Sequence, residues 1–289
     1  MLPLSEEKVK FLEEKARAIR ESIVEMLSEA GSGHTAGPLG MTDVFTALYF
    51  HVLNFDPKNP SKEDRDRLVL SNGHICPVYY ATLAHTGALR LSELKTLRKF
   101  GSKLQGHPHR EFLPIVETSS GPLGSGLSQA VGMALADRID NGKNSSKQFY
   151  CLLGDGELDE GQNWEAFMLA GKEKLQNLTV IIDRNNIQID GFTEDVMPLN
   201  PLADKLKAFN FHVEEINGHD FRDIVRALGE AQSVFEMPSV IIAHTIPGKG
   251  VKAFERKYEW HGKAPTKEEA LLALKELRNW GGEIKSEHE

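Results

Sequence analysis

Cysteine is scarce in this sequence: Cys76 and Cys151 are the only two in 289 residues. They lie far apart, each in an apolar context, so a disulfide framework is not expected. Two buried, reduced thiols are typical of a protein from a reducing compartment. The first residues, MLPLSEEKVK, also lack the charged-then-apolar pattern of a signal peptide. We therefore expect a cytoplasmic protein.

Long apolar runs, basic blocks and internal repeats are lacking as well. No stretch approaches the ~18 apolar residues that a membrane-spanning helix needs. The 34 basic and 42 acidic residues are mixed along the chain and give a net charge of −8. This balance argues against nucleic acid and against anionic membranes as partners.

What the sequence does contain is a regular alternation of apolar strands and helices. Strands are predicted at 67–71, 148–154, 178–183, 211–216 and 238–245. Helices are predicted at 5–30, with Ser5 as N-cap and Gly31 as stop, and at 42–54, 125–139, 161–174, 201–209 and 220–232. Ser92 is a further predicted cap. Continuous apolar strands between helices predict an α/β fold with a mostly parallel sheet and helices on both faces.

The domain organisation expected from this pattern is a single domain over residues 1–270. A helical, polar tail follows over 271–289, and its last stretch, GGEIKSEHE, is expected to be frayed. The glycine- and proline-rich connection at 101–126 is long for a compact domain, which indicates a functional loop.

The segment YCLLGDGELDEG, residues 150–161, ends a predicted strand on Asp155 between two glycines. A calcium loop would need glycine at its sixth position, where Glu160 stands. A dinucleotide fingerprint would need a third glycine. Capping of a helix by Asp155 or Asp159 stays open for this segment taken alone.

The next strand ends about thirty residues later, in DRNNIQIDG, which places Asn185 beside Asp155 at one edge of the sheet. With the backbone carbonyl of Ile187, these residues offer hard oxygen ligands, which suit Mg²⁺ with positions left for phosphate oxygens. Gly154 and Gly156 allow a close approach of the backbone. The residues therefore predict a divalent cation that bridges a diphosphate.

GDG, about thirty residues and then NN resembles the thiamine diphosphate signature. From about Ser22 to Pro265, the chain is similar to the amino-terminal, diphosphate-binding half of transketolases. Several ordered motifs carry the resemblance: SGH with PLGM at 32–41, DRDRLVLSNGH at 64–74, GHP at 106–108, GPLGSGLSQAVGMA at 121–134, INGHD at 216–220 and YEWHGKAP at 258–265.

The resemblance implies a role for each matching residue. Asp155, Asn185 and the Ile187 carbonyl hold Mg²⁺, and the backbone of Gly156 contacts the diphosphate of thiamine diphosphate. The run Gly121, Pro122 and Leu123 approaches the cofactor rings, although taken alone it reads as a plain turn before a helix. Ile189 supplies apolar wall. Lys249 either touches the diphosphate or sits on the surface.

Histidines supply the remaining roles. By resemblance, His34, His74, His107 and His261 contact the cofactor diphosphate (His74 and His261) and the C1 and C3 hydroxyls of a ketose, as catalytic residues. Zinc is disfavoured because no helical i, i+4 pair and no thiolate accompanies them. His109 and His219 are weaker candidates. Glu160 resembles the acid that links two active sites across a subunit contact; the alternative is a solvated glutamate in the first turn of a helix.

The family's chain continues with a pyrimidine-binding domain and a carboxyl-terminal domain, whereas this chain stops soon after His261. It is therefore either a fragment or, as we expect, the amino-terminal subunit of a split transketolase that forms an α2β2 assembly with a carboxyl-terminal subunit. Such an enzyme moves a two-carbon glycolaldehyde unit from a ketose phosphate to an aldose phosphate. The alternatives are a deoxyxylulose-phosphate synthase or 2-oxoacid dehydrogenase E1 component, and a non-catalytic regulatory subunit. Thr35, Ile75 and Cys76 depart from the family's usual residues, which leaves substrate details open.

Overall fold

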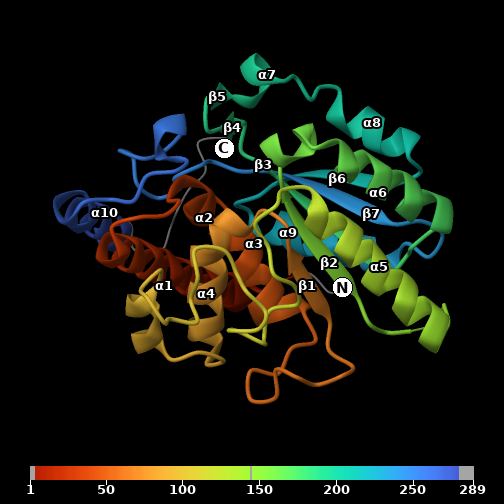
Figure 1. Ribbon diagram of the computed structural model, residues 1–289, viewed down its shortest axis with the longest axis horizontal. Helices are drawn as coiled ribbons and strands as arrows, with labels where there is room; N and C mark the ends of the chain where they lie inside the picture. Colours follow the sequence, from red (N-terminus) through yellow and green to blue (C-terminus); the bar gives the residue numbers. More distant parts are fainter. Residues whose placement is uncertain (1–3, 144, 280–289) are drawn as a thin grey trace.

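A five-stranded parallel sheet in the order β1-β2-β3-β7-β6 forms the centre of the computed structural model, which describes residues 4–143 and 145–279 (Figure 1). The strands are β1 (Arg67–Leu70), β2 (Phe149–Gly154), β3 (Leu178–Arg184), β6 (His212–Asn217) and β7 (Ser239–His244). A separate antiparallel pair consists of β4 (Ile187–Gln188) and β5 (Gly191–Phe192). The predicted parallel sheet and the positions of its strands are confirmed.

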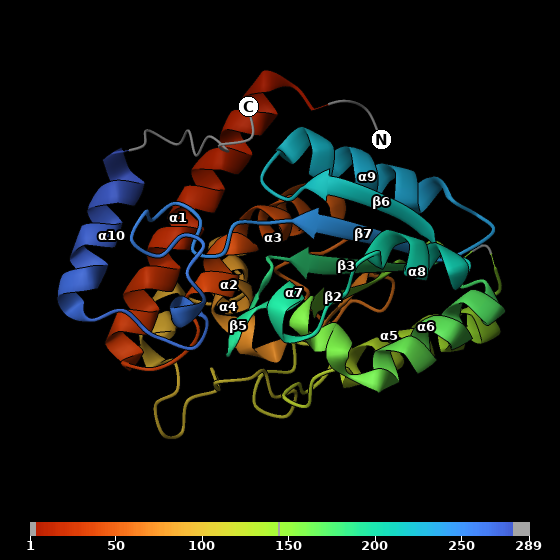
Figure 2. The same cartoon turned by 90° about the horizontal axis from the view of Figure 1, so that it is seen from above.

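Helices cover both faces of the sheet because its strands are apolar on both sides. Leu152 of β2 and Ile181 of β3 point into one hydrophobic cluster, and Cys151 and Val180 point into the other. The second cluster is closed by α5 (Ser125–Asn141), α6 (Gly161–Glu173) and α8 (Leu202–Ala208). The first is closed by α1 (Glu6–Ala30), α3 (Thr42–Ala47), α4 (Cys76–Thr86), α9 (Phe221–Ser233) and α10 (Lys267–Asn279), and Figure 2 shows the two layers on either side of the strands.

Short elements join these layers. They are α2 (Ala36–Gly40), the π-helical turn η1 (Leu48–Val52), α7 (Thr193–Val196) and the 3₁₀ turns η2 (Gly73–Ile75), η3 (Leu91–Thr96), η4 (Gly156–Asp159) and η5 (Tyr258–Trp260). Within the described ranges, no helix is both long and apolar enough to cross a membrane.

The ends of α1 follow the sequence prediction. The Ser5 hydroxyl accepts a hydrogen bond from the Lys8 amide at 3.2 Å, and Gly31, at φ +66°, ends the helix with its amide on the Leu27 carbonyl. The prediction for Ser92 was wrong, because the cap of η3 lies two residues earlier, at Arg90, whose amide donates to the Glu93 carboxylate at 3.0 Å.

The last described helix, α10, spans the domain boundary that the sequence predicted at residue 270. The boundary at residue 270 falls inside α10, whose buried residues Ala270, Ala273 and Leu277 belong to the first cluster together with residues of α1. The packed body therefore continues at least to Asn279. The segment GGEIKSEHE, expected to be frayed, lies outside the described residues.

The long connection before α5 is a loop, as predicted, with one firm anchor. Glu117 is 6% exposed and pairs with the guanidinium groups of Arg65 and Arg67, which flank the start of β1. A buried carboxylate with two arginine partners holds this loop against the sheet. The middle of this loop is therefore fixed close to the amino end of β1.

Gly171 of α6 provides a test of the packing between α6 and the turn after α8. A Cβ atom at this position would lie 1.9 Å from the Phe209 carbonyl oxygen. Gly171→Ala is therefore expected to lower the free energy of unfolding by about 2–3 kcal/mol, measured by urea denaturation. Gly132→Ala is the control, since no described atom lies within 4 Å of its Cβ position, and a gain of about 0.5–1 kcal/mol is expected. Equal effects at both sites would contradict the packing argument.

Candidate active site

Asp155 and Asn185 meet at one edge of the sheet, as the sequence predicted. β2 and β3 are adjacent and parallel, and Gly154 is paired with Asp183. The next residue, Asp155, donates its amide to the Asp183 carbonyl at 3.1 Å, and Asn185 follows directly after β3. The carboxyl ends of parallel strands place these side chains in the crevice where ligands of such sheets bind.

The carboxylate of Asp155 is buried and held by three donors. It accepts from the amides of Gly156 at 2.8 Å and Asn186 at 2.7 Å, and from Arg184 Nη1 at 3.2 Å. Burial raises its pKa to about 6 in spite of these donors and the positive charge of Arg184. A charge that the protein alone offsets incompletely is suited to a further cation.

Asn185 and Ile187 complete the oxygen set. Asn185 Oδ1 accepts from the Ile187 amide at 3.0 Å, and its Nδ2 donates to Asp183 at 2.8 Å, so the amide is oriented by its own loop. Ile187 is 2% exposed and begins the β4–β5 pair. The structure thus brings the three predicted metal ligands into one loop system that offers oxygen donors only.

Three of the four predicted catalytic histidines lie together. The ring centroids of His34 and His74 are 4.9 Å apart, those of His74 and His261 are 5.2 Å apart, and those of His34 and His261 are 5.6 Å apart. His34 follows α1, His74 lies in η2 after β1, and His261 follows η5. His107 is exposed, and its ring lies near Gly73 beside the cluster.

The cluster is neutral at physiological pH. Burial, with the nearby charges of His261, Arg98 and His107, lowers the pKa of His34 to about 4. Burial likewise lowers the pKa of His74, His107 and His261. Neutral imidazoles can both accept and donate protons, so this arrangement suits proton transfer on hydroxyl groups.

The lowered pKa of His34 predicts a stability effect with a definite sign. The unfolded chain binds a proton near pH 6.5 and the folded chain does not, so this contribution to stability is present above pH 6.5 and is lost as the pH falls toward 4. Between pH 7 and pH 5, the free energy of unfolding of His34→Gln is therefore expected to fall by about 1–2 kcal/mol less than that of the wild type. Urea denaturation without ligands at the two pH values measures this difference. Identical losses in the two proteins would contradict the lowered pKa.

Several buried polar groups at this edge are without partners. Among the described residues, the side-chain amide of Asn72, His34 Nδ1 and Ser120 Oγ make no hydrogen bond although they are buried. Asn72 is 1% exposed and lies beside Gly154. Unpaired polar groups of this kind are costly unless a ligand satisfies them. They mark the space between β1, β2 and the histidine cluster as the ligand site.

The sequence analysis missed three residues here. Asn72 follows β1 within the SNGH motif, and that motif was its only signal. Glu157 lies in the run of acids after GDG; it is 3% exposed, and burial raises its pKa. Arg184 pairs with both Asp155 and Glu194 but had no signal beyond its position at the end of a strand.

The other predicted site residues are placed less centrally. Glu160 is exposed at the start of α6, and Ile189 is 73% exposed, so neither is enclosed by this chain. Lys249 is only 2% exposed in the loop after β7, which disfavours the surface alternative. His109 stacks on Phe112, with ring centroids 4.7 Å apart. His219 belongs to a buried ion-pair network with Asp43.

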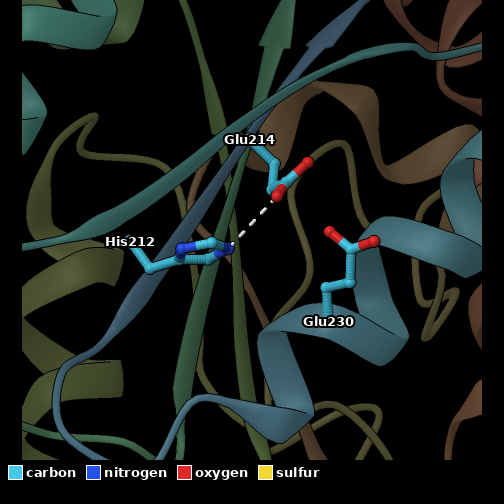
Figure 3. Close-up of side chains that lie close together, drawn as sticks. All are labelled: His212, Glu214 and Glu230. Atoms are coloured by element: carbon cyan, nitrogen blue, oxygen red, sulfur yellow. Dashed lines mark ion pairs between the residues drawn. The ribbon is translucent and has the colours of Figure 1, made fainter.

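A second cluster of potential metal ligands lies at the opposite end of the sheet. Figure 3 shows His212 facing Glu214 across a 3.3 Å ion pair, with Glu230 of α9 nearby. Arg226 already occupies the space between the two acids, because its Nη1 lies 3.0 Å from Glu214 and 2.8 Å from Glu230. A cation at this position would be repelled by the guanidinium, so the cluster is a surface ion-pair network.

A family model described as "Transketolase, thiamine diphosphate binding domain" matches residues 12–287. The chain belongs to the transketolase family. Its resemblance to that family, inferred above from the motifs, is confirmed.

Relatives of two lengths match the chain. The 6-deoxy-6-sulfo-D-fructose transketolase subunit SqwG of Clostridium sp. (strain MSTE9) is 42% identical over 93% of this chain and 97% of its own length. An apulose-4-phosphate transketolase subunit of Actinobacillus succinogenes is 42% identical over 93% of this chain and 96% of its own length. The solved transketolase of Campylobacter jejuni superposes with a TM-score of 0.87 at 37% identity, over 96% of this chain but 44% of the transketolase.

Two departures from the usual transketolase residues have structural partners. The Thr35 hydroxyl donates to the Lys263 carbonyl at 2.5 Å and so ties the His34 loop to the segment after His261. Cys76 donates to the Gly106 carbonyl at 3.2 Å, and burial raises the pKa of its thiol to about 12. Both residues therefore brace loops that carry the predicted catalytic histidines.

Proposed function

We propose that this chain is the amino-terminal subunit of a transketolase whose carboxyl-terminal half is a separate polypeptide. The observation that carries the proposal is the end-to-end match to transketolase subunits, beside full-length transketolases of which the chain spans only about two fifths. The partner is the pyrimidine-binding subunit, and the assembly is α2β2. The buried free thiols of Cys76 and Cys151 support a cytoplasmic location.

The site residues fit Mg²⁺ and thiamine diphosphate. Asp155, Asn185 and the Ile187 carbonyl would hold Mg²⁺, supported by their oxygen-only chemistry at adjacent strand ends. Gly156, His74, His261 and Lys249 would face the diphosphate, and Gly121, Pro122, Leu123 and Ile189 would line the ring pocket. The unpaired groups of Asn72 and His34 are consistent with such a ligand. When bound, thiamine diphosphate supplies a nucleophilic carbon and an electron sink for breaking the C2–C3 bond of a ketose.

The histidines perform the protein's own part of the reaction. His34, His74, His107 and His261 would hydrogen-bond the C1 and C3 hydroxyls of the ketose phosphate, and a neutral imidazole can accept the C3 hydroxyl proton as the bond breaks. Their low pKa supports the neutral state that this step needs. His34, His74 and His261 are half-buried in this chain, which limits the access of water to their rings. Glu160 would contact the equivalent site across a subunit interface, which its exposure permits.

Reconstitution tests the proposal. This chain and the carboxyl-terminal half of the transketolase are purified separately, then assayed alone and mixed, with Mg²⁺ and thiamine diphosphate. We expect ketol transfer from a ketose phosphate to an aldose phosphate only in the mixture, and a complex of α2β2 mass in sedimentation. Turnover by this chain alone would contradict the split enzyme. Use of pyruvate as the donor would favour a synthase or dehydrogenase component, and cofactor binding without turnover would favour a regulatory subunit.

A further inference from the structure

The carboxylate of Glu157 lies beside the GDG loop, residues 154–156, which the proposed function assigns to the metal and the diphosphate. Neutral hydrogen-bond donors surround it. Oε1 accepts from the Gly124 amide at 2.7 Å and from the Ser71 hydroxyl, and Oε2 accepts from the Gly154 amide at 3.0 Å. The Ser71 oxygen in turn accepts from the Gly126 amide at 3.1 Å. Hydrogen bonds to a buried carboxylate are among the stronger ones in proteins.

These donors come from three segments that converge only in the folded chain. Ser71 follows β1, Gly154 ends β2, and Gly124 and Gly126 begin α5 directly after the run Gly121–Leu123. The approach is close: a Cβ atom on Gly126 would lie 2.5 Å from Ser71 Cβ, and Gly124 adopts φ +82°. Glu157 thus joins the loop expected at the cofactor rings to the loop expected at the metal and the diphosphate.

The two loops depend on Glu157 to different degrees. The GDG loop is held independently, since the Asp155 amide donates to Asp183 at 3.1 Å and the Leu158 amide donates to Asp155 at 3.0 Å. Among the described residues, three side chains outside the run 121–124 hold it: Glu157, Gln162, which donates to the Leu123 carbonyl at 2.8 Å, and the adjacent Ser125, whose hydroxyl makes an exposed hydrogen bond to the Pro122 carbonyl at 2.8 Å. Gln162 is exposed, so the buried anchor of this run is Glu157.

We propose that Glu157 is a positioning residue that fixes the Gly121–Leu123 run at the distance from the GDG loop that thiamine diphosphate requires. The inference rests on the proposed function, because it assigns the rings to one loop and the diphosphate to the other. The carboxylate touches neither part of the cofactor. It acts on the run Gly121–Leu123 through the backbone of Gly124 and through Ser71, while the sheet holds the GDG loop.

Two probes separate this role from a general structural one. Thiamine diphosphate spans both loops, whereas inorganic diphosphate with Mg²⁺ contacts the GDG side alone. Glu157→Gln keeps the size of the side chain but replaces one acceptor oxygen with a donor that faces an amide N–H. In calorimetric titrations of the full chain in complex with its partner, we expect thiamine diphosphate affinity to fall by about 10–100-fold. Affinity for Mg²⁺ and inorganic diphosphate is expected to stay unchanged.

Matched variants complete the experiment. Glu165→Gln, at an exposed acid of α6, is expected to bind both probes as the wild type does. Ser71→Ala removes the two hydrogen bonds of the Ser71 hydroxyl, to Glu157 and from the Gly126 amide, but keeps the bond between Glu157 and Gly124. It should therefore weaken thiamine diphosphate binding less than Glu157→Gln does. This variant tests the role if Glu157→Gln does not fold. An equal loss of affinity for both probes in Glu157→Gln, or an unchanged affinity for thiamine diphosphate, would overturn the inference. A wild-type complex that does not bind thiamine diphosphate would instead overturn the proposed function.

Discussion

Replacement of Asp155 by asparagine is expected to reduce ketol transfer by the assembled enzyme at least ~10³-fold, because it removes the only carboxylate among the three predicted metal ligands. Asp155 is 1% exposed and lies at the end of β2, where loops from β1 and β3 converge. An amide of the same shape keeps an oxygen but loses the charge that would hold Mg²⁺. The measurement is steady-state turnover with saturating ketose phosphate and aldose phosphate.

The same variant separates the loss of a ligand from the loss of the fold. Burial raises the pKa of Asp155 to about 6, so at pH 7.5 the carboxylate is ionised, and burying this charge in the empty site costs stability relative to the unfolded chain. Asp155→Asn removes this cost but turns an NH₂ group toward the N–H donors that Asp155 accepts from, so without ligands we expect the stability of Asp155→Asn to lie within about 2 kcal/mol of the wild type. The variant should lack the roughly 2.7 kcal/mol that the wild type gains at one hundred times the dissociation constant of Mg²⁺ and thiamine diphosphate.

Asp159→Asn is the matched control, since Asp159 lies four residues along the chain and is exposed. Its turnover and its stabilisation by ligands should equal those of the wild type. Ligand-dependent stabilisation in Asp155→Asn as large as in the wild type would show that Asp155 does not hold the metal.

Removal of Asp43 is expected to lower the free energy of unfolding by about 3–5 kcal/mol, because it leaves a buried guanidinium without its partner. Arg20 is 0% exposed and donates to both Asp43 oxygens, at 2.9 and 2.7 Å. Burial alone would raise the pKa of Asp43, but the charge of Arg20 and the hydrogen bond from His219 lower it well below the usual range. Urea denaturation of Asp43→Ala at pH 7.5 measures the effect.

The effect should reach the loop that carries Lys249. His219 contacts Asp43 through Nδ1 at 2.8 Å, and its Nε2 accepts from the Ile246 amide at 2.7 Å, so the network extends from α1 through α3 to the loop after β7. Hydrogen exchange at the Ile246 amide should therefore be faster in Asp43→Ala than in the wild type.

Two control variants test the cause of the expected loss of stability in Asp43→Ala. The double variant Arg20→Met, Asp43→Leu removes both charges and should be less destabilised than Asp43→Ala, since no uncompensated ion is buried. Asp204→Ala, at a side chain that is 74% exposed, should change stability by less than about 0.5 kcal/mol. A double variant as unstable as the single one would assign the loss to packing rather than to charge.

The sequence alone determined which segments fold and which loops hold the chemistry. Largely apolar strands such as 178–183, alternating with helices, specify a two-faced parallel sheet, because burial on both sides leaves few polar positions in the strand. Strand polarity then places whatever follows each strand at one edge, which predicts that Asp155 and Asn185 lie together, and the resemblance to the family motifs adds His74. The family motifs lie in those loops.

Only the tertiary structure decided which side chains satisfy one another. Ser71 and Glu157 are 86 positions apart, and they meet because β1 lies beside β2 in a sheet order that the periodicity of a single strand does not encode. The same holds for Arg184 on Asp155 and for Arg20 between Asp43 and the Leu39 carbonyl. Periodicity reports whether a position is buried, whereas the partner of a buried polar group depends on which distant loop reaches it. The sequence therefore predicted where the proposed metal ligands lie, and the fold supplied the Glu157 carboxylate that joins the GDG loop to the run Gly121–Gly124.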